Sequence, residues 1–158
     1  MIDKVFQSLD RDIARLNQTL RKDGVAEIPR FFIKLLGQTA VIAAKLDIPV
    51  FATADVDAYA NFTWLAKERF CAILAEEGLH YDELSNEIWM PRETTYSSIY
   101  SGLTFDGYRA DLEYVLISKA LKAKAKNRVL IRDYLVAGAS PLFLNLCKIY
   151  GIDLEEFV

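Results

Sequence analysis

The sequence predicts one α/β domain of the α+β type, in which a mixed sheet is flanked by helices and followed by a helical C-terminal part. Helical patterns and short β-rich segments follow one another in the order α-β-α-β-α-βββ-α-α-α, which favours mixed strand pairing. The chain has 158 residues, 53% of them hydrophobic, which is enough to bury one core without disulfides. We therefore expect a single domain over residues 1–158, with no internal repeat or interdomain linker.

An N-terminal helix is predicted over residues 1–24. From Met1 to Leu20, apolar residues recur at steps of three and four between charged and polar residues, which is typical of an amphipathic helix. Gly24 ends this pattern.

The sheet-containing core is predicted over residues 31–110. Strands are assigned to apolar runs or to segments rich in β-branched and aromatic residues, and helices to apolar residues at helical spacing. The expected strands are Phe31–Leu36, Val50–Tyr59, Ile88–Met90, Tyr96–Tyr100 and Leu103–Tyr108. The expected helices are Thr39–Leu46 and Thr63–Glu77. Glycine or proline residues separate most of these segments.

The helical C-terminal part is predicted over residues 111–158. Asp111 to Val136 has a helical pattern that we divide into two helices hinged near Asn127. Ser140-Pro141 supplies an N-cap and first-turn pair for a last helix that ends at Gly151.

Composition and charge exclude several classes of protein. The 19 basic and 22 acidic residues give a formal charge of −3, and the apolar content is too high for a disordered chain. No apolar run approaches the roughly 18 to 20 residues of a membrane span, so we expect a cytoplasmic protein without a membrane partner. Cys71 and Cys147 lie far apart in apolar helical patterns, which predicts structural core cysteines.

Asp55-Val56-Asp57 places two carboxylates on one side of a predicted strand. Because side chains alternate along a strand, Asp55 and Asp57 project from the same face about 7 Å apart. Carboxylates that share a partly buried patch raise each other's pKa unless a cation neutralises them. Hard oxygen ligands with open positions for water and phosphate suit Mg²⁺ better than zinc. The alternative is a solvated strand end with two surface acids, since short DxD motifs are common.

A glycine turn follows the first predicted strand. The residues Leu35 to Ala40 (LLGQTA) indicate a strand, a turn and a helix start, which directs backbone N–H groups toward an anion above the strand end. We expect this turn and the aspartate pair to lie together, as they would in a site for a metal-bound nucleoside triphosphate. Taken alone, the turn is ordinary connection chemistry.

Together these motifs resemble a known family. Gly37-x-Thr39-Ala40 at a helix start, followed by TADVDA at Thr53 to Ala58, resembles the nucleotidyltransferase-fold proteins related to DNA polymerase β. The segment Glu113 to Ala120, with Arg128 and Arg132-Asp133-Tyr134, is similar to the Lys and Arg-Asp motifs in the nucleotidyltransferase toxins of type IV abortive-infection toxin–antitoxin systems. The resemblance covers about residues 31–136 and implies a nucleotidyltransferase-like sheet.

The resemblance also implies an activity and the residues that support it. The expected protein depends on Mg²⁺ (or Mn²⁺), binds a nucleoside triphosphate and transfers a nucleotidyl group to a hydroxyl acceptor on RNA or protein. The implied roles are metal binding by Asp55 and Asp57, phosphate binding by the turn residues Gly37, Gln38 and Thr39, and completion of the catalytic site by Lys119 and Asp133, with Asp133 orienting Lys119 or taking the acceptor proton.

Gln38 departs from the family pattern. The family usually has Gly or Ser at this position, and a bulky side chain crowds a phosphate-binding turn. The alternative function is therefore a catalytically degenerate relative that acts as a binding or regulatory module.

A third metal carboxylate is common on a later strand of this fold. The acidic residues in suitable segments are Glu93, Asp106 and Asp111. Of these, Asp106 is followed by Gly107, and an Asp-Gly pair between two β-rich segments favours a hairpin turn.

A basic stretch lies between Lys119 and Asp133, where six of the 19 cations fall within 15 residues. At helical spacing Lys119, Lys122 and Lys126 share one face, whereas Lys124 does not. Lys119 also follows an apolar turn, where an ammonium group requires a specific partner such as a phosphate or an aspartate. The other interpretations of the stretch are a solvated helix face and an RNA-binding module that uses Lys122, Lys124, Lys126 and Arg128.

The aromatic residues carry no functional prediction. The tryptophans and phenylalanines are expected to pack in the core and on the sheet. Tyr96, Tyr100 and Tyr108 fit half-buried positions on strands.

Overall fold

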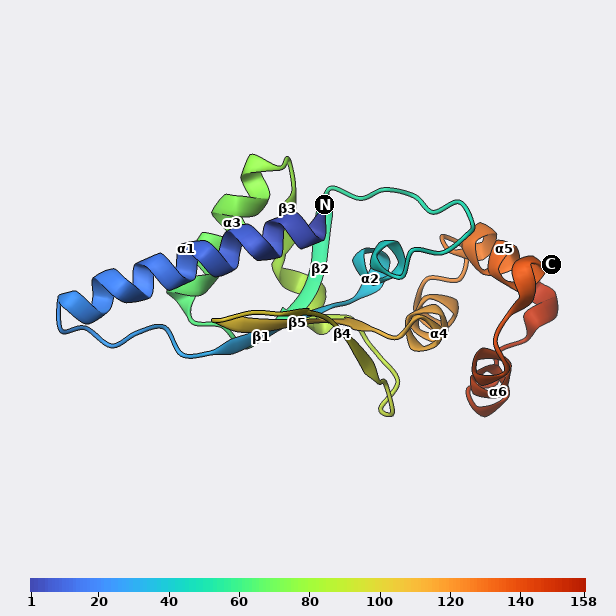
Figure 1. The fold of residues 1–158 in the computed structure, drawn as a ribbon. Coiled ribbons are helices and arrows are strands. Elements are labelled where there is room, and N and C mark those ends of the chain that lie inside the picture. Colours follow the sequence, from blue (N-terminus) through green and yellow to red (C-terminus); the bar gives the residue numbers. More distant parts are fainter.

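A five-stranded mixed sheet forms the centre of the computed structural model, which describes residues 1–158 (Figure 1). The strands are β1 (Phe31–Leu35), β2 (Asp55–Ala60), β3 (His80–Asp82), β4 (Tyr96–Ser101) and β5 (Phe105–Ala110). Their order across the sheet is β3-β2-β1-β5-β4. β1 is antiparallel to β2 and parallel to β5, β2 is parallel to β3, and β4 is antiparallel to β5. The predicted α+β class, with a mixed sheet flanked by helices, is confirmed.

Six α-helices and two 3₁₀ turns accompany the sheet. The helices are α1 (Ile2–Lys22), α2 (Gly37–Ala43), α3 (Trp64–Glu76), α4 (Leu112–Lys122), α5 (Arg128–Gly138) and α6 (Pro141–Ile149). The 3₁₀ turns are η1 (Glu83–Glu87) and η2 (Leu154–Phe157). The predicted division of the chain after Asp111 into two helices near Asn127 is confirmed, as is the last helix, whose N-cap Ser140 accepts a hydrogen bond from the Phe143 N–H.

The helices lie on one face of the sheet and at one end of it. Figure 1 shows α1 and α3 over the same face, α4, α5 and α6 together at one end, and no helix over the opposite face. Phe6 of α1 packs directly on β5, because a Cβ added at Gly107 would lie 2.5 Å from its ring. Phe6, Leu9 and Ile13 are fully buried in this layer, together with Ile33 and Leu35 of β1. No helix has the combination of length and apolarity required to span a membrane.

The strand predicted over Val50–Tyr59 begins only at Asp55. β1 pairs with Ala58 to Ala60 and then turns into α2 after Leu35, so β1 offers no partner to residues 50–54. Only Ala54 bonds to a strand, where its carbonyl accepts from the His80 N–H. Residues 50–54 form a loop in which the side chain of Phe51 is 80% exposed.

Ile88–Met90 is not a strand, and a strand that was not predicted lies just before it. His80–Asp82 forms β3, which pairs in parallel with Asp55–Asp57 of β2. The Trp89 carbonyl instead accepts a hydrogen bond from the hydroxyl of Ser118 in α4. The 88–90 segment therefore contacts a helix rather than extending the sheet.

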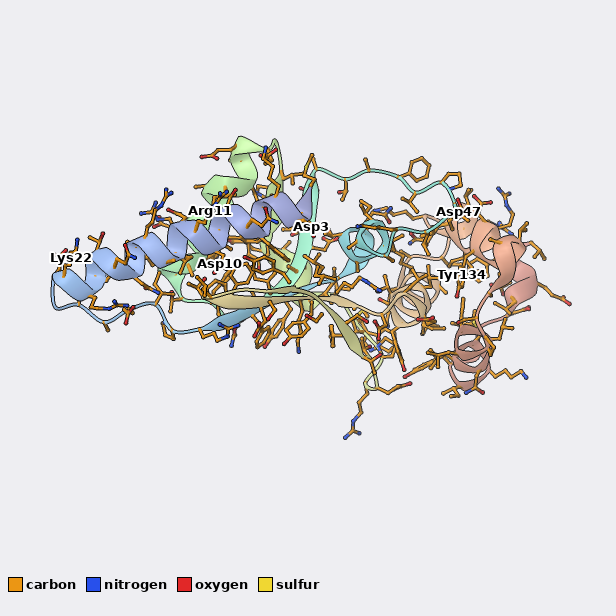
Figure 2. The ribbon with its side chains drawn as sticks, in the orientation of Figure 1. Asp3, Asp10, Arg11, Lys22, Asp47 and Tyr134 are labelled. Atoms are coloured by element: carbon orange, nitrogen blue, oxygen red, sulfur yellow. The ribbon has the colours of Figure 1, made fainter.

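The hairpin turn predicted at Asp106-Gly107 lies elsewhere, because both residues belong to β5. The chain turns at residues 102–104, and the Gly102 N–H donates to the Phe105 carbonyl. Asp10 of α1 holds this turn by accepting hydrogen bonds from the backbone N–H groups of Leu103 and Thr104. Figure 2 shows Asp10 on the side of α1 that faces the sheet.

Candidate functional site

The aspartate pair lies at the start of β2, beside the glycine turn. Asp55 is exposed and Asp57 is half-buried, while Val56 between them points into the core. The Leu36 N–H donates to the Asp57 carbonyl at 2.9 Å, and this bond joins the end of β1 to β2. The expected proximity of the turn and the carboxylate pair is thus found.

Gly37 packs against the Asp57 carboxylate. Its φ of +49° lies in the left-handed region that favours glycine, and an added Cβ would lie 2.5 Å from Asp57 Oδ2. Both the backbone conformation and the contact therefore require glycine here.

Thr39 fixes the backbone of β2. Its Oγ1 accepts from the Asp57 N–H at 2.9 Å and donates to the Asp55 carbonyl at 3.4 Å. The side chain is buried and fully used by these bonds. Its contribution to the site is to hold the strand that carries both carboxylates.

Gln38 affects the site through both its backbone and its side chain. Its backbone N–H is near enough to the Asp57 carboxylate to lower the pKa of that group. Its side-chain Nε2 donates to the Phe51 carbonyl at 2.8 Å, so the amide is held by the loop before β2. The Gln38 side chain is thus fixed beside the turn that would bind a phosphate.

Asp82 is the third carboxylate of the site, and the sequence analysis missed it. It lies opposite Asp57 in the parallel pairing of β2 with β3. Burial raises the pKa of Asp57 above its usual range, and the negative charge of Asp82 raises it further. Together these two effects outweigh the Gln38 N–H and the Lys119 ammonium, which both lower the pKa. A three-residue strand offers too few positions for a pattern to predict it.

The three acids considered at the sequence level lie in other surroundings. Glu93 accepts from the Tyr150 hydroxyl at 2.7 Å, Asp106 forms an ion pair with Arg30 at 2.6 Å, and Asp111 accepts from Thr95 and Ser97. None of them lines the cleft that holds Asp57. None of these three candidates therefore lies with Asp55 and Asp57.

Lys119 faces the carboxylates from α4. Burial lowers its pKa, the Asp57 carboxylate opposes that shift, and Lys126 adds to it. The Nζ atom donates to Asn127 Oδ1 at 3.2 Å. Asn127 therefore orients Lys119, a role that was not predicted from the sequence.

Asp133 lies outside the cleft. It is on α5, and its carboxylate is 3.6 Å from Nε of the neighbouring Arg132. It is not among the residues that line the space around Lys119. The structure thus corrects the expectation that Asp133 orients Lys119.

These groups surround one cleft of about 820 Å³. The acidic residues on its lining are Asp55, Asp57, Asp82 and Glu87. The basic residues are Lys119, Lys122 and Lys126, whereas Lys124 forms an ion pair with Glu156 elsewhere. The first three lysines thus line one cleft and Lys124 does not, although α4 ends at Lys122 and Lys126 lies in the turn after it rather than on the predicted helix face. Trp89 and Phe51 add aromatic surface to the walls.

The fit of the site to a metal rests on its donor chemistry. Nowhere in the chain are three or more His, Cys, Asp or Glu side chains gathered in positions to hold one ion. Asp55 and Asp57 provide two carboxylates on one side of β2, and the pKa of Asp57 is raised first by burial and then by the negative charge of Asp82. Two carboxylates completed by phosphate and water oxygens suit Mg²⁺.

His80 adds a further group beside the carboxylates. Its Nδ1 lies 3.5 Å from Asp55 Oδ1, and both side chains are exposed. Only the pairing of β3 with β2 brings the two residues together, so no role for His80 was predicted from the sequence.

Comparison with protein-family models, with curated proteins and with solved structures finds no match for this chain. The chemistry of the cleft is therefore the basis for the function proposed below.

Proposed function

We propose that this chain is a Mg²⁺-dependent protein of the nucleotidyltransferase type, which binds a nucleoside triphosphate and transfers a nucleotidyl group to a hydroxyl acceptor on RNA or protein. One observation carries the proposal: the Asp57 carboxylate lies against the Gly37 turn, and Lys119 faces it across the same cleft. In the cell, the proposed protein acts in the cytoplasm as the toxin of an abortive-infection system.

Asp55 and Asp57 would hold Mg²⁺ or Mn²⁺. The bound ion supplies charge neutralisation for the triphosphate. The fit is supported by the crowding of Asp57 by Asp82, since a cation would relieve that repulsion.

The other residues of the cleft have separate roles in the transfer. A bond forms between the acceptor oxygen and the α-phosphorus, and the bond from that phosphorus to the pyrophosphate oxygen breaks. Lys119 offsets the charge that develops on the transferring and leaving phosphates, and Lys122 and Lys126 bind the pyrophosphate. Asp82 is the carboxylate positioned to take the proton of the acceptor hydroxyl.

A catalytically degenerate relative, acting as a binding or regulatory module, is the second candidate. It is favoured by the Gln38 side chain, because the hydrogen bond of its amide to the Phe51 carbonyl fixes a bulky group beside the turn that would bind a phosphate. The variant Gln38→Gly separates the two candidates. In a working enzyme it should leave the transfer rate nearly unchanged, whereas in a blocked relative it should enlarge the thermal shift caused by nucleotide.

The direct test is release of pyrophosphate from each of the four nucleoside triphosphates with Mg²⁺ and an RNA or protein acceptor. Lys119→Ala should remove most of the rate, because its role lies in the charged transition state. Lys124→Ala is the matched control, since Lys124 pairs with Glu156 outside the cleft and its loss should leave the rate unchanged. Absence of nucleotide binding in both the native chain and Gln38→Gly, with Mg²⁺ and with Mn²⁺, would overturn the nucleotide hypothesis and leave only the fold.

A further inference from the structure

The sheet face opposite α1 and α3 carries aromatic rings around one cation. Because side chains alternate along the strands, residues that flank the buried positions Ile33, Ala58 and Phe105 point to the face that no helix covers (Figure 1). We call this surface the aromatic face; its members are Phe32 and Lys34 of β1, Tyr59 of β2, Tyr96 of β4 and Tyr108 of β5. All five are at least partly exposed, and Tyr59 is 45% exposed.

The strand register sets these side chains side by side. Lys34 is paired with Tyr59 on one neighbouring strand and with Tyr108 on the other. Its Nζ lies 4.8 Å from the centre of the Phe32 ring and 4.5 Å from that of Tyr96. The rings of Phe32 and Tyr59 are 5.8 Å apart. Four strands thus contribute to one continuous platform.

The charge of the platform is not neutralised by a carboxylate. Lys34 takes part in no ion pair, whereas nearby Arg30 is engaged by Asp106 at 2.6 Å. A shallow groove of about 630 Å³ runs over Phe32, Lys34, Tyr96 and Tyr108 of the face, and its lining also includes Asn61, Thr95 and the paired Arg30 and Asp106. No Leu, Ile, Val or Met side chain lines this groove.

We propose that the aromatic face binds single-stranded nucleic acid, with bases stacked on its rings and a backbone phosphate paired with Lys34. Unpaired bases expose π-faces that stack on aromatic side chains, and a nearby cation supplies the phosphate contact. A protein partner fits less well, because the centres of protein interfaces are depleted of lysine. A duplex does not present the faces of its bases, so it cannot stack in this way.

This binding is independent of the nucleotide chemistry proposed for the cleft. Asp57 precedes Tyr59 by two residues, so it lies on the same side of β2 as the aromatic face. No residue of the face, however, lines the cleft. Binding can therefore be measured in EDTA without triphosphate. Its failure would leave the proposed function standing, and failure of nucleotide binding would leave this inference standing.

The test is fluorescence anisotropy of the full chain with fluorescein-labelled U15, dT15 and a 15-base-pair duplex. We expect both single strands to bind more tightly than the duplex, and their relative affinities distinguish RNA from DNA. Tyr59→Ala and Tyr108→Ala should each weaken single-strand binding by about tenfold. Lys34→Gln should reduce the slope of log affinity against log salt by about 0.7.

The controls separate the face from general effects. Trp64→Ala removes an exposed aromatic side chain on α3, and Lys22→Gln removes an exposed cation at the end of α1; neither should change binding. Tyr59→Phe keeps the ring and should retain affinity, while Tyr59→Ile keeps strand propensity without the ring and should lose it even if the Ala variant unfolds.

Three results of the binding assay would overturn the proposal. They are no binding of either single strand, equal binding of the duplex, and unchanged affinity in folded Tyr59→Ile and Tyr108→Ala variants. Sedimentation that reveals a dimer broken by Tyr59→Ile would assign the face to a second copy of the chain and would likewise overturn it.

Discussion

The Asp57 carboxylate lies so close to Gly37 that a Cβ on the glycine would come within 2.5 Å of Oδ2. This contact joins the turn after β1 to the acidic strand β2, and it predicts a specific cost for a methyl group at residue 37.

Gly37→Ala should destabilise the chain more than Gly24→Ala does. Both glycines have a positive φ, so each substitution costs about 1–2 kcal/mol of backbone strain. Only Gly37 has neighbours within 4 Å of the added Cβ, so its variant must also displace Asp57. Urea unfolding of the two variants measures the difference, and equal losses of unfolding free energy would contradict the contact.

Mg²⁺ or Mn²⁺ should raise the thermal midpoint of the native chain, and more so with a nucleoside triphosphate, because a ligand that binds only the folded state stabilises it. Asn at both Asp55 and Asp57 should abolish this shift. Asp47→Asn, in the loop before β2 labelled in Figure 2, is the control and should keep it. Differential scanning fluorimetry gives the result, and a metal-dependent shift that survives the double substitution would place the metal elsewhere.

Asp10 should contribute stability that depends on pH. Burial raises its pKa, but hydrogen bonds from Thr104, Tyr100 and the Leu103 N–H together outweigh burial, so the pKa is lowered. The ionised carboxylate therefore stabilises the fold above its ordinary pKa of 3.8, and this stability is lost as pH falls through the lower folded-state value. Asp10→Asn should cost about 1–3 kcal/mol at pH 7.

The measurement is urea unfolding of the native chain and Asp10→Asn at pH 7 and at pH 3. The gap between the two proteins should narrow at the lower pH. Asp3→Asn, at the start of α1, is the control, because the N–H groups of the hairpin turn bond to Asp10 and not to Asp3. A gap that stays constant with pH would show that the charge of Asp10 is not what stabilises the turn.

Asp133→Asn should leave triphosphate binding intact, whereas Asn127→Ala should weaken it. Asn127 holds the Nζ of Lys119 at 3.2 Å, while Asp133 lies beside Arg132 outside the cleft. Titration with inorganic tripolyphosphate and Mg²⁺, followed by calorimetry, isolates phosphate binding from base recognition. A loss of binding in Asp133→Asn as large as that in Lys119→Ala would support the role implied by the family resemblance over the one inferred from the structure.

Local sequence patterns were sufficient for much of the fold. The periodicity of α1, the apolar run of β1 and the Ser140-Pro141 start of α6 depend on neighbours within one helical turn or one strand, so they can be read without knowing the tertiary structure. The same local geometry predicted that Asp55 and Asp57 share a side of β2, and that Lys119, Lys122 and Lys126 converge while Lys124 does not.

Contacts between distant segments decided the rest. The turn lies at residues 102–104 because Asp10, more than 90 residues earlier, binds the N–H groups there, although Asp106-Gly107 has the stronger turn composition. Asp82 reaches Asp57 only through the pairing of β3 with β2, and four separate strands assemble the aromatic face. The sequence by itself thus determined where the helices and the strands β1, β4 and β5 lie, because those choices are local. Only the tertiary structure decided which acids, amides and rings meet, because hydrogen bonds and burial between distant segments have no periodicity along the chain.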